Sequence, residues 1–311
     1  MIRAVSALLC LATLTALARD PPTTQPATRA IYLSALDDKG APVPGLTPAD
    51  IVIKEDGKTR QVVRVTPAAS KLSIAVLVDD GGVGLNDFRS GLAGFMNQLL
   101  SQSEFSVTGV AEQNRTYADF TSDGYVLGNA IRALQARNVN GGGHLVEAVL
   151  DAVRFGQRKE AERPVILVVT NQANEYGTLP ADSAIEQVTR TATAIYVVEV
   201  LRRSGSVGQA PGAYDAMSAA ARESEASEAN RERNKVLGDG PRQTGGRRVE
   251  LSSTADIPRA LLSIAEDLKH QYVAVFTSEA RRSAVSRLAV TTNKRGVRVR
   301  AATFATDRPA R

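Results

Sequence analysis

The sequence predicts an α/β protein with a mostly parallel central sheet flanked by helices, plus a small β-sheet or sandwich built from both ends of the chain. The first observation is three continuous apolar runs, at residues 72–78, 164–170 and 194–200, which are typical of strands buried on both faces of a sheet. Segments with helical spacing of apolar residues separate these runs, and such alternation predicts a parallel sheet with right-handed crossovers. The third observation is that β-like segments lie at both ends of the 311-residue chain, outside this alternating block.

The N-terminus has the pattern of an export signal. Arg3 provides a positive start, an apolar stretch follows, and a small-x-small cleavage site ends at Ala18. The apolar stretch is shorter than the roughly 18 residues of a membrane span, so we expect a signal peptide over residues 1–18 rather than an anchor. Residues 19–30 are rich in Pro and Thr and predict a flexible leader. The single cysteine, Cys10, lies within the signal, so the exported chain is expected to form no disulfide.

The β-like segments flank the alternating block on both sides. We expect N-terminal strands over residues 31–36, 51–53 and 61–65, and C-terminal strands over residues 272–277, 284–291 and 297–304. The last strand alternates valine with arginine, which predicts one buried and one solvated face. Neither group can enclose a core alone. We therefore expect residues 31–70 and 271–304 to form one β subdomain into which residues 71–270 are inserted, with a tail over residues 305–311.

Within the inserted block, shorter strands and amphipathic helices complete the alternation. The further strands are expected over residues 105–110, 116–120 and 248–251. The helices are expected over residues 86–100, 125–136, 145–155, 181–190 and 256–269, the last capped by Thr254. Residues 202–246 interrupt the rhythm with Gly/Ser-rich and then Ala-rich, charged chain. There we expect a surface helix with frayed ends over residues 214–236, whose charges form a solvated face.

Two carboxylates, Asp79 and Asp80, follow directly after the first apolar run, and a Gly-rich turn comes next. They therefore belong at the carboxyl end of a central strand. In open α/β sheets, ligands bind in the crevice outside the carboxyl ends of the strands. The sequence predicts a ligand-binding edge here but does not identify the ligand.

Several short motifs occur in a distinctive order along the chain. They are a lead-in over residues 36–51 followed by residues 54–58, the strand that ends at Asp79, and then residues 141–148, 165–171, 244–246 and 271–272. In this order and spacing they resemble the von Willebrand factor A (VWFA) fold, and more narrowly the bacterial VWFA-related domain family known from Acidobacteria. The resemblance covers nearly all of residues 30–304 and implies a Rossmann-like sheet.

Families of this kind often carry a metal-ion-dependent adhesion site, and the resemblance places its positions on this chain. The pattern has Asp-x-Ser-x-Ser after the first strand, a threonine in a Gly-rich loop and an aspartate after a later strand. The corresponding residues are Asp79, Gly81, Val83, Gly143 and Asn171, so only the first matches. A register that starts at Asp80 restores no hydroxyl. Because Mg²⁺ needs near-octahedral hard oxygen ligands, we expect a degenerate site without a bound metal, although Mg²⁺ or Mn²⁺ there is the alternative.

Two other possibilities stay open at this stage. A replacement site for Zn²⁺ or Mn²⁺ could be built from Asp79, Asp80, His144 and Glu147, which would suit a metal-dependent binding protein or hydrolase. The simpler interpretation is that His144 starts a helix and Glu147 favours the dipole of its first turn. Separately, residues 281–311 hold nine Lys or Arg against one acid. This basic segment could bind an anionic surface polymer, or it could be the solvated face of strands, which we prefer.

The sequence lacks the usual signatures of catalysis. It contains two histidines, no Walker-type loop, no dinucleotide-binding glycine fingerprint and no cysteine after the signal. It also contains no tryptophan, and the basic segment interleaves no aromatic platform for nucleic acid. We therefore expect a non-enzymatic interaction or scaffold protein, exported to the periplasm or beyond the cell. It would bind a protein partner through the top of the VWFA-like domain, with no catalytic residues, no nucleic acid and no membrane span after cleavage.

Overall fold

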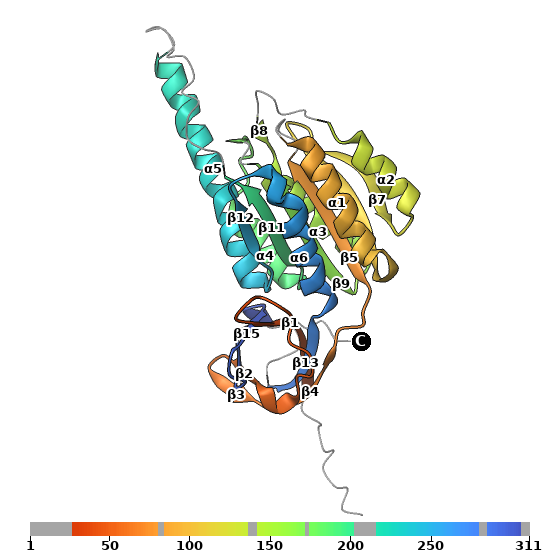
Figure 1. The fold of residues 1–311 in the computed structure, drawn as a ribbon. Coiled ribbons are helices and arrows are strands. Elements are labelled where there is room, and N and C mark those ends of the chain that lie inside the picture. Colours follow the sequence, from red (N-terminus) through yellow and green to blue (C-terminus); the bar gives the residue numbers. More distant parts are fainter. Residues whose placement is uncertain are drawn as a thin grey trace, which may run out of the picture.

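The structure, a computed structural model, describes residues 27–79, 84–135, 142–171, 174–201, 216–279 and 285–305. It consists of an α/β domain and a β-sandwich at one end of it (Figure 1). The expected signal peptide and most of the expected leader lie outside the described residues. The end of the expected leader, residues 27–30, is not flexible chain but the start of a strand that spans Ala27–Asp37. In the part of the chain that is described, no helix is both long and apolar enough to cross a membrane.

The α/β domain is built on a six-stranded sheet with the order β12-β11-β9-β5-β6-β7. Its strands are β5 (Leu72–Asp79), β6 (Ser103–Val110), β7 (Arg115–Thr121), β9 (Arg163–Thr170), β11 (Ala194–Val200) and β12 (Arg248–Leu251). All neighbours pair in parallel except β7, which is antiparallel to β6. Numbered along the chain, the order is 3-2-1-4-5-6, a doubly wound sheet in which the chain changes direction between β5 and β9.

Three helices cover each face of this sheet. One face carries α1 (Leu85–Leu99), α2 (Gly124–Ala133) and α6 (Ile257–Lys269), and the other carries α3 (Leu145–Arg158), α4 (Ala181–Arg190) and α5 (Ala216–Thr244). Side chains of β5 alternate between the two cores, with Ile74 and Val76 in the first and Ala75 and Leu77 in the second. Each strand of such a sheet is buried on both sides, which explains why β5 and β9 are apolar almost throughout.

The close contact between α5 and the sheet depends on one glycine. Gly246 follows the helix and passes so near β11 that a Cβ there would lie 1.7 Å from the carbonyl oxygen of Ile195. No side chain fits in that space. The Gly-Gly motif that supported the VWFA resemblance is therefore required for packing at this point.

The two ends of the chain form the sandwich together, as the sequence predicts. One sheet has the order β15-β1-β13-β4, with β15 (Val297–Ala301), β1 (Ala27–Asp37), β13 (Tyr272–Ser278) and β4 (Val62–Pro67). The other has the order β16-β14-β2-β3, with β16 (Phe304–Ala305), β14 (Ser286–Thr292), β2 (Ile51–Glu55) and β3 (Lys58–Arg60). The buried residues Leu33, Ile53 and Phe276 lie in the shared core.

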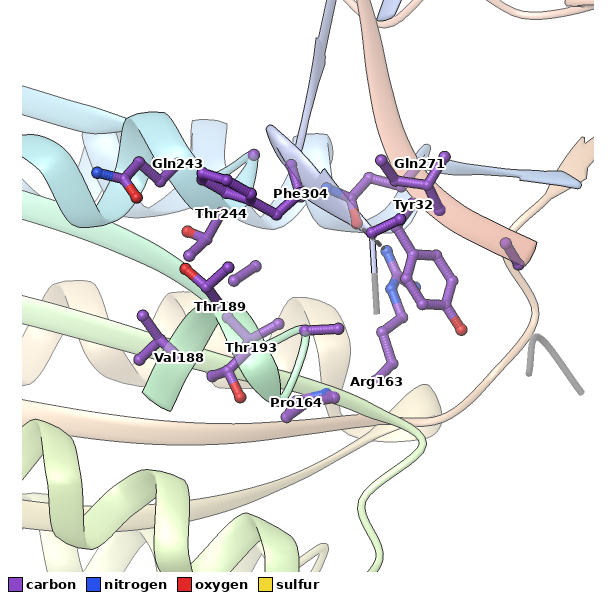
Figure 2. Close-up of a pocket in the computed structure, with 18 of the residues that line it drawn as sticks. Tyr32, Arg163, Pro164, Val188, Thr189, Thr193, Gln243, Thr244, Gln271 and Phe304 are labelled. Carbon is purple, nitrogen blue, oxygen red and sulfur yellow. Dashed lines mark hydrogen bonds between the residues drawn. The ribbon is translucent and has the colours of Figure 1, made fainter. Parts of the chain in front are cut away.

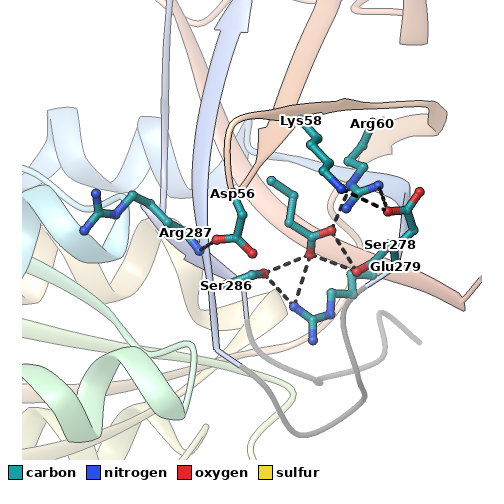
Figure 3. Close-up of polar contacts among 9 residues, drawn as sticks. Asp56, Lys58, Arg60, Ser278, Glu279, Ser286 and Arg287 are labelled. Atoms are coloured by element: carbon teal, nitrogen blue, oxygen red, sulfur yellow. Dashed lines mark hydrogen bonds and ion pairs between the residues drawn. The ribbon is translucent and has the colours of Figure 1, made fainter.

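A buried glutamate ties the two sheets of the sandwich together at one end. Glu55 is fully buried, and its carboxylate accepts hydrogen bonds from Ser278, Ser286 and the buried Arg29 at 2.8–3.2 Å. Arg29 also donates to the Ser286 hydroxyl at 2.7 Å. Arg60 reaches the same carboxylate at 3.0 Å and also pairs with the exposed Glu279 (Figure 3). The cluster therefore joins strands from both ends of the chain.

Buried polar groups also connect the sandwich to the α/β domain. Arg163, at the start of β9, donates to the Leu268 carbonyl at 2.7 Å and to the Gln271 side chain at 2.5 Å. Gln271 in turn donates to Ser34 of the sandwich and to the hydroxyl of Tyr196, at 3.1 and 2.9 Å. The small cavity beside these residues has a volume of about 70 Å³ (Figure 2). That volume suits a few waters rather than an organic ligand.

Three expectations about local structure are wrong. The helix expected over residues 214–236 continues through Pro241 to Thr244, and one face of its second half is buried. The cap of the short 3-10 turn before α6 is Ser253 rather than Thr254, whose hydroxyl instead donates to Asp87 at 2.6 Å. Arg300 is not on a solvated face, because it pairs with the buried Asp267 at the junction.

Candidate functional site

Three neighbouring strands end in polar residues that lie on the same face of the sheet. They are Asp79 at the end of β5, Thr170 at the end of β9 and Glu199 near the end of β11. Thr170 and Glu199 are directly paired in register, and the strand alternation turns all three toward the helices α3, α4 and α5. Each is buried, with exposures of 3%, 0% and 0%. We call these three residues the carboxyl-edge triad.

A buried arginine from α5 lies on this triad. Arg233 is 3% exposed, and its Nη2 donates to the Thr170 hydroxyl at 2.5 Å. The same nitrogen is 3.4 Å from Asp79 Oδ2, while Nη1 is 3.8 Å from Glu199 Oε1. The Thr170 hydroxyl in turn donates a hydrogen bond to Asp79 Oδ2 at 2.6 Å. One guanidinium therefore contacts the ends of three adjacent strands.

The position of Arg233 follows from the helical period of α5. Buried residues recur along this helix at 233, 236, 237, 240, 241 and 244, which is the spacing of one helix face. Val236 and Leu237 pack in the core on that side of the sheet. Arg233 occupies the next position along the same buried face, one turn closer to the carboxyl edge. The expectation that all charges of this helix are solvated is therefore wrong.

Other polar residues of α5 hold it against neighbouring elements. The Glu232 carboxylate accepts from the backbone N–H of Ala181, at the start of α4, at 2.5 Å. Lys235 pairs with Asp182 at 2.7 Å, and the Asn230 side chain accepts from the N–H of Glu175 at 2.9 Å. The helix is thus attached at the top of the domain by polar contacts and lower down by apolar packing.

A second arginine, Arg248, also contacts a buried carboxylate of this edge. Arg248 of β12 donates to Glu199 Oε2 at 2.5 Å and lies 3.2 Å from Glu250. It is more exposed than Arg233, with 27% of its side chain accessible against 4%. The two buried carboxylates, Asp79 and Glu199, therefore face two guanidinium groups.

The structure places the predicted adhesion-site positions as follows. Asp79 ends β5, and Asn171 follows β9 and is buried. Gly143 lies in the two-residue strand β8 (Gly142–Gly143), which pairs with β10 (Asn174–Glu175). Asp80, Gly81 and Val83 lie outside the described residues. Sequence reasoning missed Thr170, Glu199 and Arg233. Glu199 could have been noticed, because it is the one charged residue of an otherwise apolar strand.

His144 and Glu147 lie where the simpler interpretation puts them. His144 is the residue before α3, and Glu147 is in the first turn of that helix. The two side chains are 3.6 Å apart. In the ranges that the structure describes, no three His, Cys, Asp or Glu side chains gather to hold a metal ion. Asp79 instead belongs to the triad with Arg233, so the replacement metal site has no support from the described residues.

A buried glutamate, Glu175, caps helix α3. It is fully buried, and its carboxylate accepts from the N–H groups of Leu145 at 3.0 Å and Gly177 at 3.2 Å. A carboxylate at a helix N-terminus satisfies backbone donors that have no partner inside the helix. Burial nevertheless raises the pKa of Glu175 to about 7, against the smaller opposite effect of these N–H donors and of Arg233.

A groove opens between α5 and the segment that follows β10. Its volume is about 810 Å³, and its lining includes Tyr176, Pro180, Glu225 and Glu228. Tyr176 is 47% exposed. The N-terminal half of α5, which supplies Glu225 and Glu228 to the lining, extends beyond the rest of the domain (Figure 1). The top of the domain therefore combines a groove with an exposed aromatic side chain.

The residues present at the carboxyl edge do not fit a divalent cation. Mg²⁺ requires several free oxygen ligands in octahedral geometry. Here Asp79 Oδ2 already accepts from Thr170 and lies beside a guanidinium. A divalent ion would also be repelled by the positive charge of Arg233 at this distance.

The α/β domain has the Rossmann-like sheet that the VWFA resemblance implies. No family model matches the sequence, and no curated protein matches it. Solved structures that resemble it include a von Willebrand factor type A protein from Catenulispora acidiphila, with 9% identity, a TM-score of 0.46, and coverage of 93% of this chain and 77% of that chain. An aerotolerance-related membrane protein from Bacteroides fragilis shows 13% identity and a TM-score of 0.44 over 64% of this chain and 98% of that chain. Proximal thread matrix protein 1 from the mussel byssus, with a zinc-occupied adhesion motif, shows 11% identity and a TM-score of 0.45 over 68% and 49%.

Proposed function

We propose that this protein is an exported, non-enzymatic interaction module that binds a protein partner through the top of its VWFA-like domain without a metal ion. The observation that supports this most is the contact of Arg233 with Asp79, Thr170 and Glu199. These described polar groups, at the carboxyl ends of β5, β9 and β11, contact one another within the chain.

The environments of the two histidines also favour a role other than catalysis. His144 lies beside Glu147 at the start of α3, and His270 contacts the Glu266 carbonyl at 2.8 Å at the end of α6. A general base needs a reacting group within hydrogen-bonding reach and a nucleophile or water to activate. Neither contact forms part of a nucleophile–base pair among the described residues.

The proposed binding surface is the top of the domain, around Tyr176 and the groove beside α5. Aromatic side chains that are partly exposed are typical anchors of protein interfaces. This surface lies beside β10, which follows the carboxyl end of β9, and an open α/β sheet binds its ligands at that edge. Export, suggested by the expected signal peptide, would bring this surface to the periplasm or the cell exterior.

Site-specific photo-crosslinking in cells of the native host tests the proposal. The full chain would carry p-benzoylphenylalanine in place of Tyr176 on the top, or in place of Val63 on the sandwich, where the side chain is 52% exposed. We expect a discrete protein adduct from position 176, unchanged by EDTA, and none from position 63. Adducts from position 63 alone, or a hydrolytic activity that is lost in Asp79→Ala, would show that the proposal is wrong.

A further inference from the structure

We propose that Arg233 is the resident cation of the carboxyl edge, so that its guanidinium takes the place that a metal ion would otherwise need. The proposal concerns the same edge as the proposed function but does not depend on the identity of a partner. In this proposal the positive charge at the edge comes from Arg233 and not from a metal ion.

Burial creates the need for a positive charge at this point. Asp79 and Glu199 are both buried at the ends of strands β5 and β11. A buried carboxylate without a counter-charge or hydrogen bonds is very costly. Thr170 donates one hydrogen bond to Asp79 Oδ2 at 2.6 Å, but Thr170 carries no charge. A cation at this site therefore offsets part of that cost.

Arginine is suited to span the separation that the sheet imposes. Its guanidinium is planar and presents several N–H donors in fixed directions. Nη2 serves Thr170 and Asp79, while Nη1 faces Glu199 one strand further along. A lysine ammonium is a compact point charge and could not contact both ends of this row from the same helix position. The residue type therefore matches the spacing of β5, β9 and β11.

A simpler possibility is that Arg233 forms an ordinary buried ion pair with no relation to a ligand site. The location of Arg233 favours a cation at the ligand-binding edge over an ordinary ion pair. The contact lies on the carboxyl ends of β5 and β9, between which the sheet changes direction, and this is where the fold places ligands. It also involves Asp79, the one residue that matches the adhesion-site pattern. Arg248 supplies a comparison, because it pairs with the same Glu199 but comes from the edge strand β12 and is more exposed.

The test combines charge neutralisation with metal titration on the exported chain, residues 19–311. The variants are Arg233→Met, the same change combined with Asp79→Asn and Glu199→Gln, and Arg248→Met as the matched control. Thermal unfolding of each is measured in EDTA and then with Mg²⁺, Mn²⁺ or Zn²⁺ alone. Direct Mn²⁺ binding is followed by the loss of its free-ion electron paramagnetic resonance signal.

We expect no metal to shift the midpoint of the wild-type chain. Arg233→Met should lower the midpoint in EDTA by roughly 6–15 °C, because one partner of a buried charge cluster is removed. Neutralising Asp79 and Glu199 together should restore most of that loss. Arg248→Met should have the smaller effect. Mn²⁺ should bind to Arg233→Met and raise its midpoint, but should not bind once Asp79 and Glu199 are also neutralised.

Three results would overturn the proposal. The first is a metal shift in the wild-type chain that depends on Asp79, which would mean that an ion still has room beside the arginine. The second is an Arg233→Met deficit that neutralisation leaves unchanged, which would make the side chain a packing element. The third is an Arg233→Met chain that binds no ion, which would make the cluster an ordinary ion pair. If this variant does not fold in EDTA, refolding it with each ion and refolding the neutralised variant give the same distinctions. Each of these results is separate from the crosslinking result at Tyr176.

Discussion

Replacing Glu175 with glutamine isolates the effect of one buried carboxyl on the stability of the top of the domain. The side chain is fully buried beneath the groove and caps α3 through the N–H groups of Leu145 and Gly177. Glutamine has the same shape and keeps one acceptor oxygen, but it cannot ionise. The difference between wild type and Glu175→Gln at each pH therefore reports the ionisation of this group.

The expected size and direction of the effect follow from the pKa. Burial raises the pKa of Glu175 from 4.5 to about 7, so the folded protein holds this proton more tightly than the unfolded chain does. The stability that the group contributes is fully present below about pH 4.5 and is lost as the pH rises through 7. The gap between the two values corresponds to about 3 kcal/mol in the free energy of unfolding.

Urea unfolding followed by circular dichroism, at half-unit steps from pH 4.5 to 8.5, measures this effect. We expect wild type to lose about 2–3 kcal/mol relative to Glu175→Gln across that range, mostly between pH 5 and 7.5. Glu147→Gln, which changes a more exposed carboxyl in the first turn of the helix that Glu175 caps, is the matched control and should track wild type. A constant difference between wild type and Glu175→Gln at every pH would refute the reasoning, because the carboxyl would then be ionised to the same extent in both states.

Three further predictions concern packing and buried charge away from the site. Gly246→Ala should reduce the free energy of unfolding by at least about 3 kcal/mol, because its Cβ would collide with the Ile195 carbonyl oxygen; urea unfolding measures this, and a change below about 1 kcal/mol would contradict it. Glu55→Gln should cost roughly 3 kcal/mol because it leaves buried guanidinium charge without its counter-ion, whereas Glu279→Gln, which changes an exposed partner in the same cluster, should leave the midpoint unchanged. Arg163→Met should speed amide exchange in β1 and β13 while leaving β5 and β6 protected, and equal loss of protection in both parts would argue against a separate junction.

Much of the fold follows from local patterns that the sequence states directly. The runs at residues 72–78, 164–170 and 194–200 form β5, β9 and β11, because strands buried on both faces must be apolar throughout. The sandwich could be predicted because neither end of the chain is long enough to form a core alone. The strand β3 was not expected, because its three residues carry no alternation and form only by pairing with β2 across a tight turn at Asp56 and Gly57.

The candidate site was harder to predict, because its contacts join residues far apart in the sequence. Asp79 and Arg233 are separated by 154 positions, and nothing near either residue shows that they meet. The extent of α5 was underestimated because Gly238, Gly240 and Pro241 are poor helix formers. Packing of Val236 and Leu237 against the sheet outweighs that preference. The pKa of Glu175 likewise depends on burial by the surrounding fold, which sequence spacing does not reveal.

The departures from the adhesion-site pattern and the presence of Arg233 have a common physical basis. A chain that retains Asp79 on a buried strand end must supply it with a positive charge, from a metal ion, a proton or a basic side chain. Gly143 and Asn171 provide few oxygen ligands for an ion, so the sequence alone already argues against a bound metal ion. The remaining question is which helix can place a basic residue over that strand end. Extending the buried period of Val236 and Leu237 by one turn gives Arg233, so a charged residue on the buried face of a helix is the signal to look for.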